Sequence, residues 1–463
     1  MANNLLVISD LHLGEGLSPT DEVRPDVELC TFVEHYTEVR RSDRPWTLVI
    51  NGDMVDFMGI CLMPSDVGWV TDLHPDSHYY GLGSRAHAAE IKLRTVIARH
   101  ARVFRALARF VGQGNDLALV VGNHDAEFHW QGVQALFQQA IARTWAGLQE
   151  QGRSSSEVFS SISFHPWFFL EEGVAWIEHG HQYDPYCSFE HALDPATDEQ
   201  DLDANVGDIT VRYFVNHYAA HAAEHWGFGF WAYLGWWARQ GGRKWIGIAA
   251  AYKDMVRRLI EVWLRRTPEA LSAARARHAE RLRALAERVK LSEEALHRVH
   301  ELRRPPMTDG LLRVIRAFQV DRLALLFSLP LVVAAVALTP WPWWPMVVGI
   351  IGVALFFAGR VALAEVESTD PRGTMRRVSA RIRKIARVPI VVFGHSHTAE
   401  AEGEGTDWYF NTGHWAHHGG GESATHVVIE RTDKGLAAAL CQWTGTTSRV
   451  LHRALEPRAL GDA

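Results

Sequence analysis

The chain has 463 residues, enough for two to four domains of about 100–200 residues each and for a sizeable buried core. Apolar residues make up 47% of the chain, which excludes a disordered protein, and the formal net charge of −7 argues against a surface devoted to nucleic acid. The 4 cysteines form no Cys-x-x-Cys pair, so we expect neither a disulfide scaffold nor a thiolate zinc site, whereas 25 histidines suit metal or proton chemistry.

Short apolar runs alternate with helical patterns up to about residue 186, and this alternation predicts an α/β fold. A helix is predicted over residues 86–111. The first apolar run reads as a buried strand rather than a secretory signal because no basic segment precedes it, so this part is expected to be cytoplasmic. The predicted strands are Leu5–Ile8, Thr47–Ile50, Leu117–Val121 and Val174–Ile177.

Residues 187–388 have a different character and are predicted to form a helical insertion. A charge-dense helical stretch runs from 249 to 304, with Thr267 and Ser292 as predicted N-caps. Two apolar segments, 323–339 and 346–363, are predicted transmembrane helices joined by a Trp/Pro turn, because 17 to 20 helical residues span about 25–30 Å. The alternative is a buried helical hairpin in a soluble cap.

Strand patterns return after residue 389, over 390–393, 426–430 and 436–441. The insertion therefore interrupts one discontinuous domain made of residues 1–186 and 389–463. Both halves of that domain must lie on one side of any membrane, which a two-pass hairpin satisfies. Basic residues flank both outer ends of the hairpin, so both termini are expected in the cytoplasm.

Five short polar motifs each follow a predicted strand. Because ligand sites in α/β sheets collect beyond the carboxyl ends of strands, we expect these segments to meet at one edge of one sheet. Residues i and i+2 of an extended chain point the same way, so Asp10 and His12 can face one point, as can His395 and His397. The glycines permit close backbone approach. The motifs are Ser9–His12, Asn51–Asp56, Gly122–Asp125, Glu178–His181 and Gly394–His397.

This donor set contains nitrogen and oxygen without sulfur, which suits Mn, Fe, Zn or Co better than a calcium cage. Several carboxylates and imidazoles at one edge indicate two metals, about 3.5–4 Å apart. Taken singly, each motif is more often a polar turn than a ligand pair. All five in this order are a much stronger indication.

With these motifs the sequence resembles the calcineurin-like metallophosphoesterases over about residues 1–186 and 389–463. The family pattern is Asp-x-His, Gly-Asp-x-x-Asp, Gly-Asn-His-Asp/Glu, a lone His and Gly-His-x-His, and every part of it is present here. The resemblance implies a four-layer α/β/β/α sandwich, into which the all-α insertion is placed. It also implies two divalent metal ions, Mn, Fe or Zn, with Mn favoured.

The resemblance also implies roles for individual residues. Asp10, His12 and His397 would bind one metal, and Asn123, His179 and His395 the other, with Asp53 bridging the two. His124 would contact phosphate and protonate the leaving oxygen, and Asp56 would orient His124. His181 and Asp184 could orient ligands or belong to a polar loop, and His414 could touch phosphate or belong to a solvated glycine-rich loop.

The function expected from these features is that of a membrane-anchored binuclear-metal phosphoesterase on the cytoplasmic face. It would hydrolyse a phosphate or diphosphate ester of a lipid or lipid-linked substrate with a hydroxide that the metals generate. Its expected partners are membrane lipids and a phosphorylated substrate, and nucleic acid is not expected. One alternative is a tethered phosphatase for a soluble nucleotide or phosphoprotein, and another is an inactive membrane scaffold.

Overall fold

The computed structural model of the protein describes residues 2–14, 24–41, 43–68, 74–195, 202–219, 242–265, 267–310, 313, 334, 337–338, 340, 342–363, 370–415, 423–433 and 435–455. The chain forms two compact units. Unit 1 comprises Met1–Ala204, Thr267–Arg304 and Pro371–Ala463, and unit 2 comprises Asn205–Arg266 and Pro305–Asp370. The predicted domain 1–186 and 389–463 falls within unit 1, which also takes in three helices from the predicted insertion.

The first sheet of unit 1 has 7 strands in the order β12-β11-β10-β1-β2-β3-β4. Strands β1 to β4 run parallel to one another, whereas β10 is antiparallel to β1 and to β11, and β11 is antiparallel to β12. The predicted strands at 5–8, 47–50, 117–121, 426–430 and 436–441 all lie in this sheet. Its strands are β1 (Asn4–Ile8), β2 (Trp46–Asn51), β3 (Asp116–Val120), β4 (Ile162–His165), β10 (Thr425–Thr432), β11 (Gly435–Trp443) and β12 (Ser448–Leu455).

The second sheet has 5 strands in the order β5-β6-β7-β9-β8. Its central strand β7 is parallel to both β6 and β9, and the edge strands are antiparallel to theirs. The predicted strands at 174–177 and 390–393 are β6 and β7. The strands are β5 (Phe168–Glu171), β6 (Ala175–Glu178), β7 (Ile390–Phe393), β8 (Ala399–Glu404) and β9 (Asp407–Thr412).

Alternation along the strands explains how the two sheets pack. Leu5 and Val7 of β1 lie in a core shared with Val392 of the second sheet. Leu6 and Ile8, which point to the opposite face of β1, lie in a separate core beneath helices. Both faces of each sheet are therefore buried, which matches the near-continuous apolar runs of the parallel strands.

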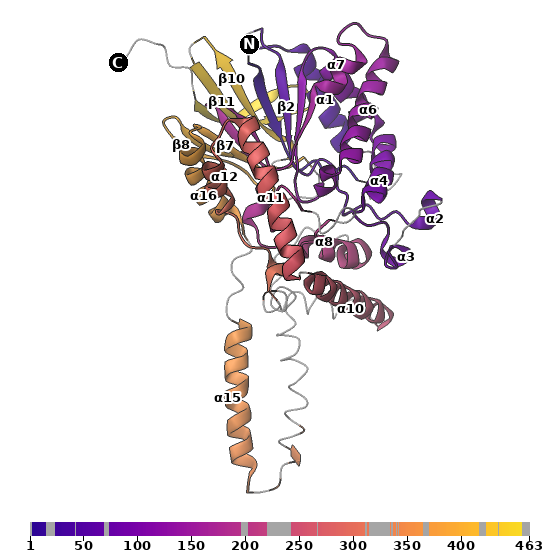
Figure 1. The fold of residues 1–463 in the computed structure, drawn as a ribbon, viewed down its shortest axis with the longest axis vertical. Coiled ribbons are helices and arrows are strands. Elements are labelled where there is room, and N and C mark those ends of the chain that lie inside the picture. The colour runs from indigo at the N-terminus through magenta and orange to yellow at the C-terminus, as the bar shows by residue number, and fades with distance from the viewer. Residues whose placement is uncertain are drawn as a thin grey trace. The chain divides into compact units, whose positions relative to one another are not determined.

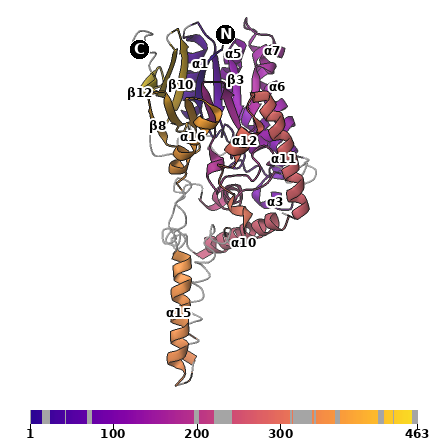
Figure 2. The same ribbon diagram turned by 60° about the vertical axis from the view of Figure 1, so that its left-hand side comes forward.

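Helices cover the two outer faces and complete four layers, α/β/β/α, as the resemblance implied (Figures 1 and 2). One outer core packs against the first sheet and the other against Trp176, Val391 and Phe393 of the second. The helices over the first sheet are α1 (Arg24–Glu38), α4 (Ala86–Arg99), α5 (Ala101–Gly112) and α6 (Gln131–Leu148), and those over the second are α11 (Pro268–Val289), α12 (Glu293–His300) and α16 (Arg372–Ala386). Shorter helices are α2 (Pro64–Val67), α3 (Ser77–Tyr80) and α7 (Ser155–Ser160).

The single helix predicted over 86–111 is two helices, α4 and α5, that divide at His100. The His100 ring is buried, with Nδ1 at 2.8 Å from an Asp26 carboxylate oxygen and Nε2 at 3.0 Å from the Gly14 carbonyl oxygen. These tertiary bonds override the local helical pattern. The predicted N-caps are confirmed, because the Thr267 and Ser292 hydroxyls accept from Ala270 N at 3.3 Å and Ala295 N at 3.1 Å.

Unit 2 is helical in its described part, which comprises α8 (Val206–Thr210), a π-helix (Val211–Ala219), α10 (Gly242–Arg265) and α15 (Trp344–Leu363). The predicted span 346–363 falls within α15. The predicted span 323–339 lies outside the described residues, apart from 334 and 337–338. Among the helices that the structure describes, none has the length and apolar character required to cross a bilayer, so the predicted transmembrane hairpin is not supported.

Candidate metal centre

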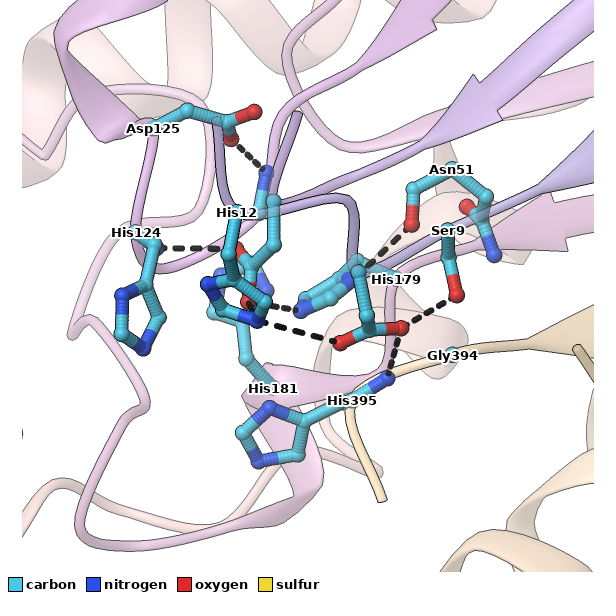
Figure 3. A network of polar contacts seen from close by, with 12 residues as sticks. Ser9, His12, Asn51, His124, Asp125, His179, His181, Gly394 and His395 are labelled. Carbon is cyan, nitrogen blue, oxygen red and sulfur yellow. Dashed lines mark hydrogen bonds and ion pairs between the residues drawn. The ribbon is translucent and has the colours of Figure 1, made fainter. Parts of the chain in front are cut away.

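The five predicted motifs meet within unit 1, but they come from both sheets rather than from one. Three of them follow the neighbouring parallel strands β1, β2 and β3 of the first sheet, and two follow β6 and β7 of the second. The expectation of one edge of one sheet was therefore wrong. Figure 3 shows the side chains of His12, His124, His179 and His395 gathered where these strands end.

The orientation of several proposed ligand side chains is set by residues with left-handed backbone conformation, not by extended segments. Such φ values are uncommon for residues other than glycine and cost free energy that the surrounding structure must offset. Asp10 and His12 face one point as predicted, but through left-handed turns rather than an extended segment, whereas His395 and His397 belong to different clusters. The φ angles are 55° at Asp10, 48° at His12, 54° at Asp53, 64° at His395 and 52° at His397.

Two motif glycines allow neighbouring segments to approach closely, as predicted. Gly52 has φ +82°, and a Cβ there would lie 2.3 Å from Nδ1 of His179. A Cβ at Gly122 would lie 2.1 Å from Oδ1 of Asp53. Any side chain at either position would displace a proposed ligand.

A first donor cluster consists of Asp10, His12 and His397, whose candidate ligand atoms all lie within 4.8 Å of one another. Nε2 of His397 is 3.1 Å from Oδ1 of Asp10 and 3.2 Å from Nε2 of His12. The Asp10 side chain is fully buried, while that of His397 is 43% exposed. The cluster therefore opens to solvent on one side.

A second donor cluster consists of Asp53, His179 and His395, under the same 4.8 Å limit. Nε2 of His179 lies 3.1 Å from Oδ2 of Asp53. Nδ1 of His179 donates to the Asn51 carbonyl oxygen at 2.8 Å, which assigns the lone pair to Nε2 on the Asp53 side. Oδ2 of Asp184 is 3.1 Å from Nε2 of His395, so Asp184 touches a proposed ligand.

Asp53 connects the two clusters. Its Oδ2 lies 3.9 Å from Nε2 of His12 and 3.1 Å from Nε2 of His179, and its Oδ1 accepts from the His124 N–H at 2.9 Å. The preceding residue, Asn123, has a buried Oδ1 without a hydrogen-bond partner among the residues described. Such an atom is a suitable metal ligand.

His124 and Asp56 form the predicted pair. Nδ1 of His124 lies 2.7 Å from Oδ1 of Asp56, and the His124 ring meets the His12 ring edge-on at 4.5 Å. The His124 side chain is 23% exposed, so a ligand can reach it. Burial disfavours the ionised Asp56 carboxyl, but the facing His124 outweighs it and lowers the pKa of Asp56 to about 2.

The charge state of the centre follows from mutual contacts. Burial opposes the charge on Asp53, but His179 and His124 outweigh it and hold its pKa well below the ordinary value. Burial likewise opposes the charge on His179, yet Asp53 raises the pKa of His179 to about 9. Near neutral pH a proton is therefore favoured on Nε2 of His179, the atom that faces Asp53. Metal binding displaces protons from ligand atoms, so a cation would take the place of this proton.

His181 and His414 are both buried rather than solvated. Nε2 of His181 lies 2.9 Å from the side-chain amide nitrogen of Gln182, and its ring lies 5.5 Å from that of His179. Nδ1 of His414 donates to the His397 carbonyl oxygen at 2.9 Å, with the two rings stacked at 5.7 Å. His414 thus contacts His397 through a hydrogen bond and a stacked ring, and its side chain is buried rather than solvated.

Three supporting residues lie within the predicted motifs but were given no role. The Ser9 hydroxyl donates to the Asp10 carboxylate. Asp125 accepts from Gly122 N at 2.6 Å and Met54 N at 2.8 Å, which ties two motif loops together. The buried Glu178 carboxylate accepts from the two indoles of Trp167 and Trp176, both at 2.9 Å. Each of the three directly adjoins a predicted site residue in the sequence, and that adjacency was the available signal.

Comparison with known proteins agrees with this geometry. The family model for calcineurin-like phosphoesterases matches residues 4–242, a range that contains the first four motifs. The Gly394–His397 motif lies beyond the match, and the fold brings it to the same centre. None of the curated proteins or solved structures compared with the chain matches it. The chain belongs to the calcineurin-like phosphoesterases and is a metal-dependent phosphoester hydrolase.

Proposed function

We propose that this centre binds two divalent cations and hydrolyses a phosphate or diphosphate ester. One cation would be held by Asp10, His12 and His397. The other would be held by Asn123, His179 and His395, with Asp53 shared. The observation that carries the proposal is the junction of two donor clusters at a single carboxylate, since Asp53 lies within 4 Å of an imidazole from each.

The donor atoms suit such ions. Oδ1 of Asp10, Oδ1 of Asn123 and Nε2 of His179 are buried and lack hydrogen-bond geometry to any group in the described part of the chain. Buried polar atoms without a hydrogen bond are costly, and coordination satisfies them. A mixed set of imidazole, carboxylate and amide donors is compatible with Mn, Fe or Zn, and we propose Mn as the working ion.

Bound divalent ions lower the pKa of a water and offset charge on phosphate oxygens. The chain itself supplies the proton for the leaving group. His124 is accessible at 23% exposure, and Asp56 at 2.7 Å from Nδ1 orients its ring. Nε2 of His124 would then face the substrate, contact a phosphate oxygen and donate a proton to the departing oxygen.

An activity assay tests the proposal. Metal-depleted protein is reloaded with Mn²⁺ and given a chromogenic phosphoester, alongside His124→Ala and Asp53→Asn. The control is His297→Ala, which alters a half-exposed histidine on α12. We expect turnover by the wild type and the control, a loss of at least about a hundredfold in Asp53→Asn, and a smaller loss in His124→Ala, because a chromogenic leaving group needs less protonation. Equal turnover in all four proteins, or none in any, would count against the proposal and favour the inactive scaffold.

We also propose that the substrate is lipid-linked and that α15 associates with a lipid surface. The support is that α15 exposes large apolar side chains all along its described length, with Ile350 at 62%, Phe356 at 63% and Phe357 at 63%. Contiguous apolar surface of this kind marks an interaction site. The alternative is a soluble nucleotide or phosphoprotein substrate.

Vesicle binding separates these alternatives. The wild type should sediment with phospholipid vesicles, and Phe356→Asp/Phe357→Asp should stay in the supernatant. Phe159→Asp, at an exposed phenylalanine of α7, is the matched control and should sediment normally. Faster hydrolysis of a lipid-linked diphosphate than of a soluble nucleotide, lost in the double variant, supports the lipid reading. A wild type that ignores vesicles would overturn it.

A further inference from the structure

A separate cluster of three histidines, His191, His278 and His300, lies in unit 1 and is built from residues outside the five motifs. His191 follows β6 in a loop, His278 lies on α11, and His300 ends α12. One ring nitrogen from each lies within 4.8 Å of the other two. The ring centroids of His191 and His278 are 5.1 Å apart, and those of His278 and His300 are 4.5 Å apart.

Two of these residues, His191 and His278, are buried, and all three rings carry a nitrogen without the partner that a buried polar group normally has. His191 and His278 are 8% and 6% exposed, and neither ring nitrogen of either residue has a hydrogen-bond partner within the described ranges. The same holds for Nδ1 of His300. Each buried polar group without a hydrogen bond destabilises the folded state. A cation that accepts lone pairs from all three rings explains why such atoms gather at one point.

The surroundings favour a closed structural site. Leu282 and Leu285 of α11 and Val299 of α12 lie in the core that covers the second sheet. The Trp167 ring meets His300 edge-on at 5.9 Å. Apolar packing of this kind limits the access of bulk water to the site.

Two nearby arginines already have acidic partners. Arg277 donates to Asp194 at 2.6 Å, and Arg303 donates to Glu190 at 2.8 Å. Arg303 also donates from Nε to Nε2 of His300 at 3.1 Å. Coordination through Nδ1 of His300 leaves this bond in place, whereas coordination through Nε2 would require Arg303 to release it while it keeps Glu190.

We propose that His191, His278 and His300 bind a single zinc-like cation that is separate from the candidate phosphoesterase centre. Imidazole donors select zinc or another late transition metal over magnesium or calcium. Three atoms 4.8 Å apart would lie about 2.8 Å from a central ion, whereas a zinc–nitrogen bond is about 2.0–2.1 Å, so each ring must move inward by less than about 1 Å. A water would complete the tetrahedron.

The protonation of the rings agrees with this geometry. Burial lowers the pKa of His278 to about 4 and that of His300 to about 2, so both rings are neutral near pH 7. Neutral imidazole is the form that binds metal. The ion would join α11 and α12 to the loop that continues from Asp184, and its binding free energy would stabilise that outer layer.

Metal content tests the site. Chelator-treated protein is reloaded with Zn²⁺, desalted and analysed for zinc per chain. We expect His278→Ala to hold one ion fewer than the wild type, and His297→Ala, the exposed neighbour on α12, to match the wild type. The His278→Ala and His297→Ala variants are also compared in a protein that carries Asp53→Asn and His179→Ala. In that protein the zinc count at the three-histidine cluster can be read whether or not the proposed phosphoesterase centre binds metal. Zinc should also raise the melting temperature of that protein, but not after His278→Ala.

Equal zinc content in wild type and folded His278→Ala would overturn the proposal and leave three buried neutral imidazoles with no ion. If His278→Ala does not fold, crystals of the zinc-loaded wild type decide. An anomalous peak at bonding distance from all three rings supports the site. Fully loaded crystals without a peak there exclude it.

Discussion

The two histidine clusters of unit 1 differ in charge and access. The candidate phosphoesterase centre combines imidazoles with the carboxylates of Asp10 and Asp53 and has one half-open ligand, His397 at 43% exposure. The His191–His278–His300 cluster has no carboxylate in its ligand set, and two of its three residues, His191 and His278, are buried. Carboxylates can hold two cations close together, and an open face admits substrate, whereas neutral rings in an apolar core suit one structural ion. The difference fits the proposed roles, catalysis at the carboxylate-containing centre and stabilisation of the fold at the three-histidine cluster.

Loss of the shared carboxylate should have the largest effect. Asp53→Asn keeps the size of the side chain but removes the charge that lies 3.1 Å from His179 and 3.9 Å from His12. Several kcal/mol of charge stabilisation depend on the cations, so kcat/KM should fall about 10³-fold or more. Steady-state kinetics with the bound metal counted in the same sample measure this. An Asn variant that keeps both its ions and its rate would contradict the role of Asp53.

The proposed role of His124 as proton donor predicts that the effect of its removal on kcat depends on the leaving group. His124→Ala should lower kcat by about 10²-fold or more for an alkyl phosphoester, because the departing alkoxide needs a proton. A nitrophenyl ester, whose leaving group needs less protonation, should lose clearly less. Parallel assays of both esters with wild type and variant give the ratio. An equal loss for both esters would assign His124 to binding instead.

A smaller effect is expected from Asp184, which contacts His395 at 3.1 Å. Partners that orient ligands typically contribute about 10–100-fold to metal affinity or activity. Asp184→Asn should therefore weaken Mn²⁺ binding by about that factor, and added Mn²⁺ should restore most of the rate. Metal titrations of activity are the measurement. Unchanged Mn²⁺ affinity would make Asp184 part of an ordinary polar loop.

The structural cluster should influence stability rather than rate. His278→Ala should lower the melting temperature of the zinc-loaded protein by several degrees, because a bound ion contributes free energy of folding. Its kcat on a chromogenic phosphoester should remain close to that of the wild type. Differential scanning calorimetry and one activity assay suffice. A rate loss comparable to that of Asp184→Asn would show that the two clusters are not independent.

A buried histidine outside both clusters sharpens the comparison through pH. Burial lowers the pKa of His426 from 6.5 to about 3, and its Nε2 lies 3.0 Å from the Ser448 hydroxyl. Between those pH values the unfolded chain binds a proton at His426 and the folded chain does not, so the free energy of unfolding falls as pH drops through this window.

Urea unfolding at pH 7 and pH 5 measures the effect. The wild type should lose about 1–2 kcal/mol more than His426→Gln, since one unit of pKa shift corresponds to about 1.4 kcal/mol. Parallel losses in both proteins would show that His426 does not contribute to acid sensitivity.

The sequence predicted that the five motifs meet, because their chemistry is local. Each motif follows an apolar run that forms a strand, and parallel neighbours such as β1, β2 and β3 must end at one edge. It did not predict that β6 and β7 belong to a second sheet, since strand order depends on long-range packing. Nor did it predict the left-handed φ of Asp10 and His395, which glycine-rich turns only suggest.

The His191–His278–His300 cluster was not foreseen because no spacing reveals it. His278 and His300 occupy different helices, and His191 lies in a loop far earlier in the chain. Only the packing of α11 and α12 over the second sheet brings the rings together. In the same way, the break between α4 and α5 at His100 depends on contacts with Asp26 and Gly14, which are distant in the sequence.

The most direct test of the account is an anomalous difference map from crystals soaked in Mn²⁺. We predict two peaks about 3.5–4 Å apart, one beside Asp10, His12 and His397 and one beside His179 and His395, with the Asp53 carboxylate between them. A single peak, or two peaks that Asp53 does not touch, would contradict a binuclear centre in this protein.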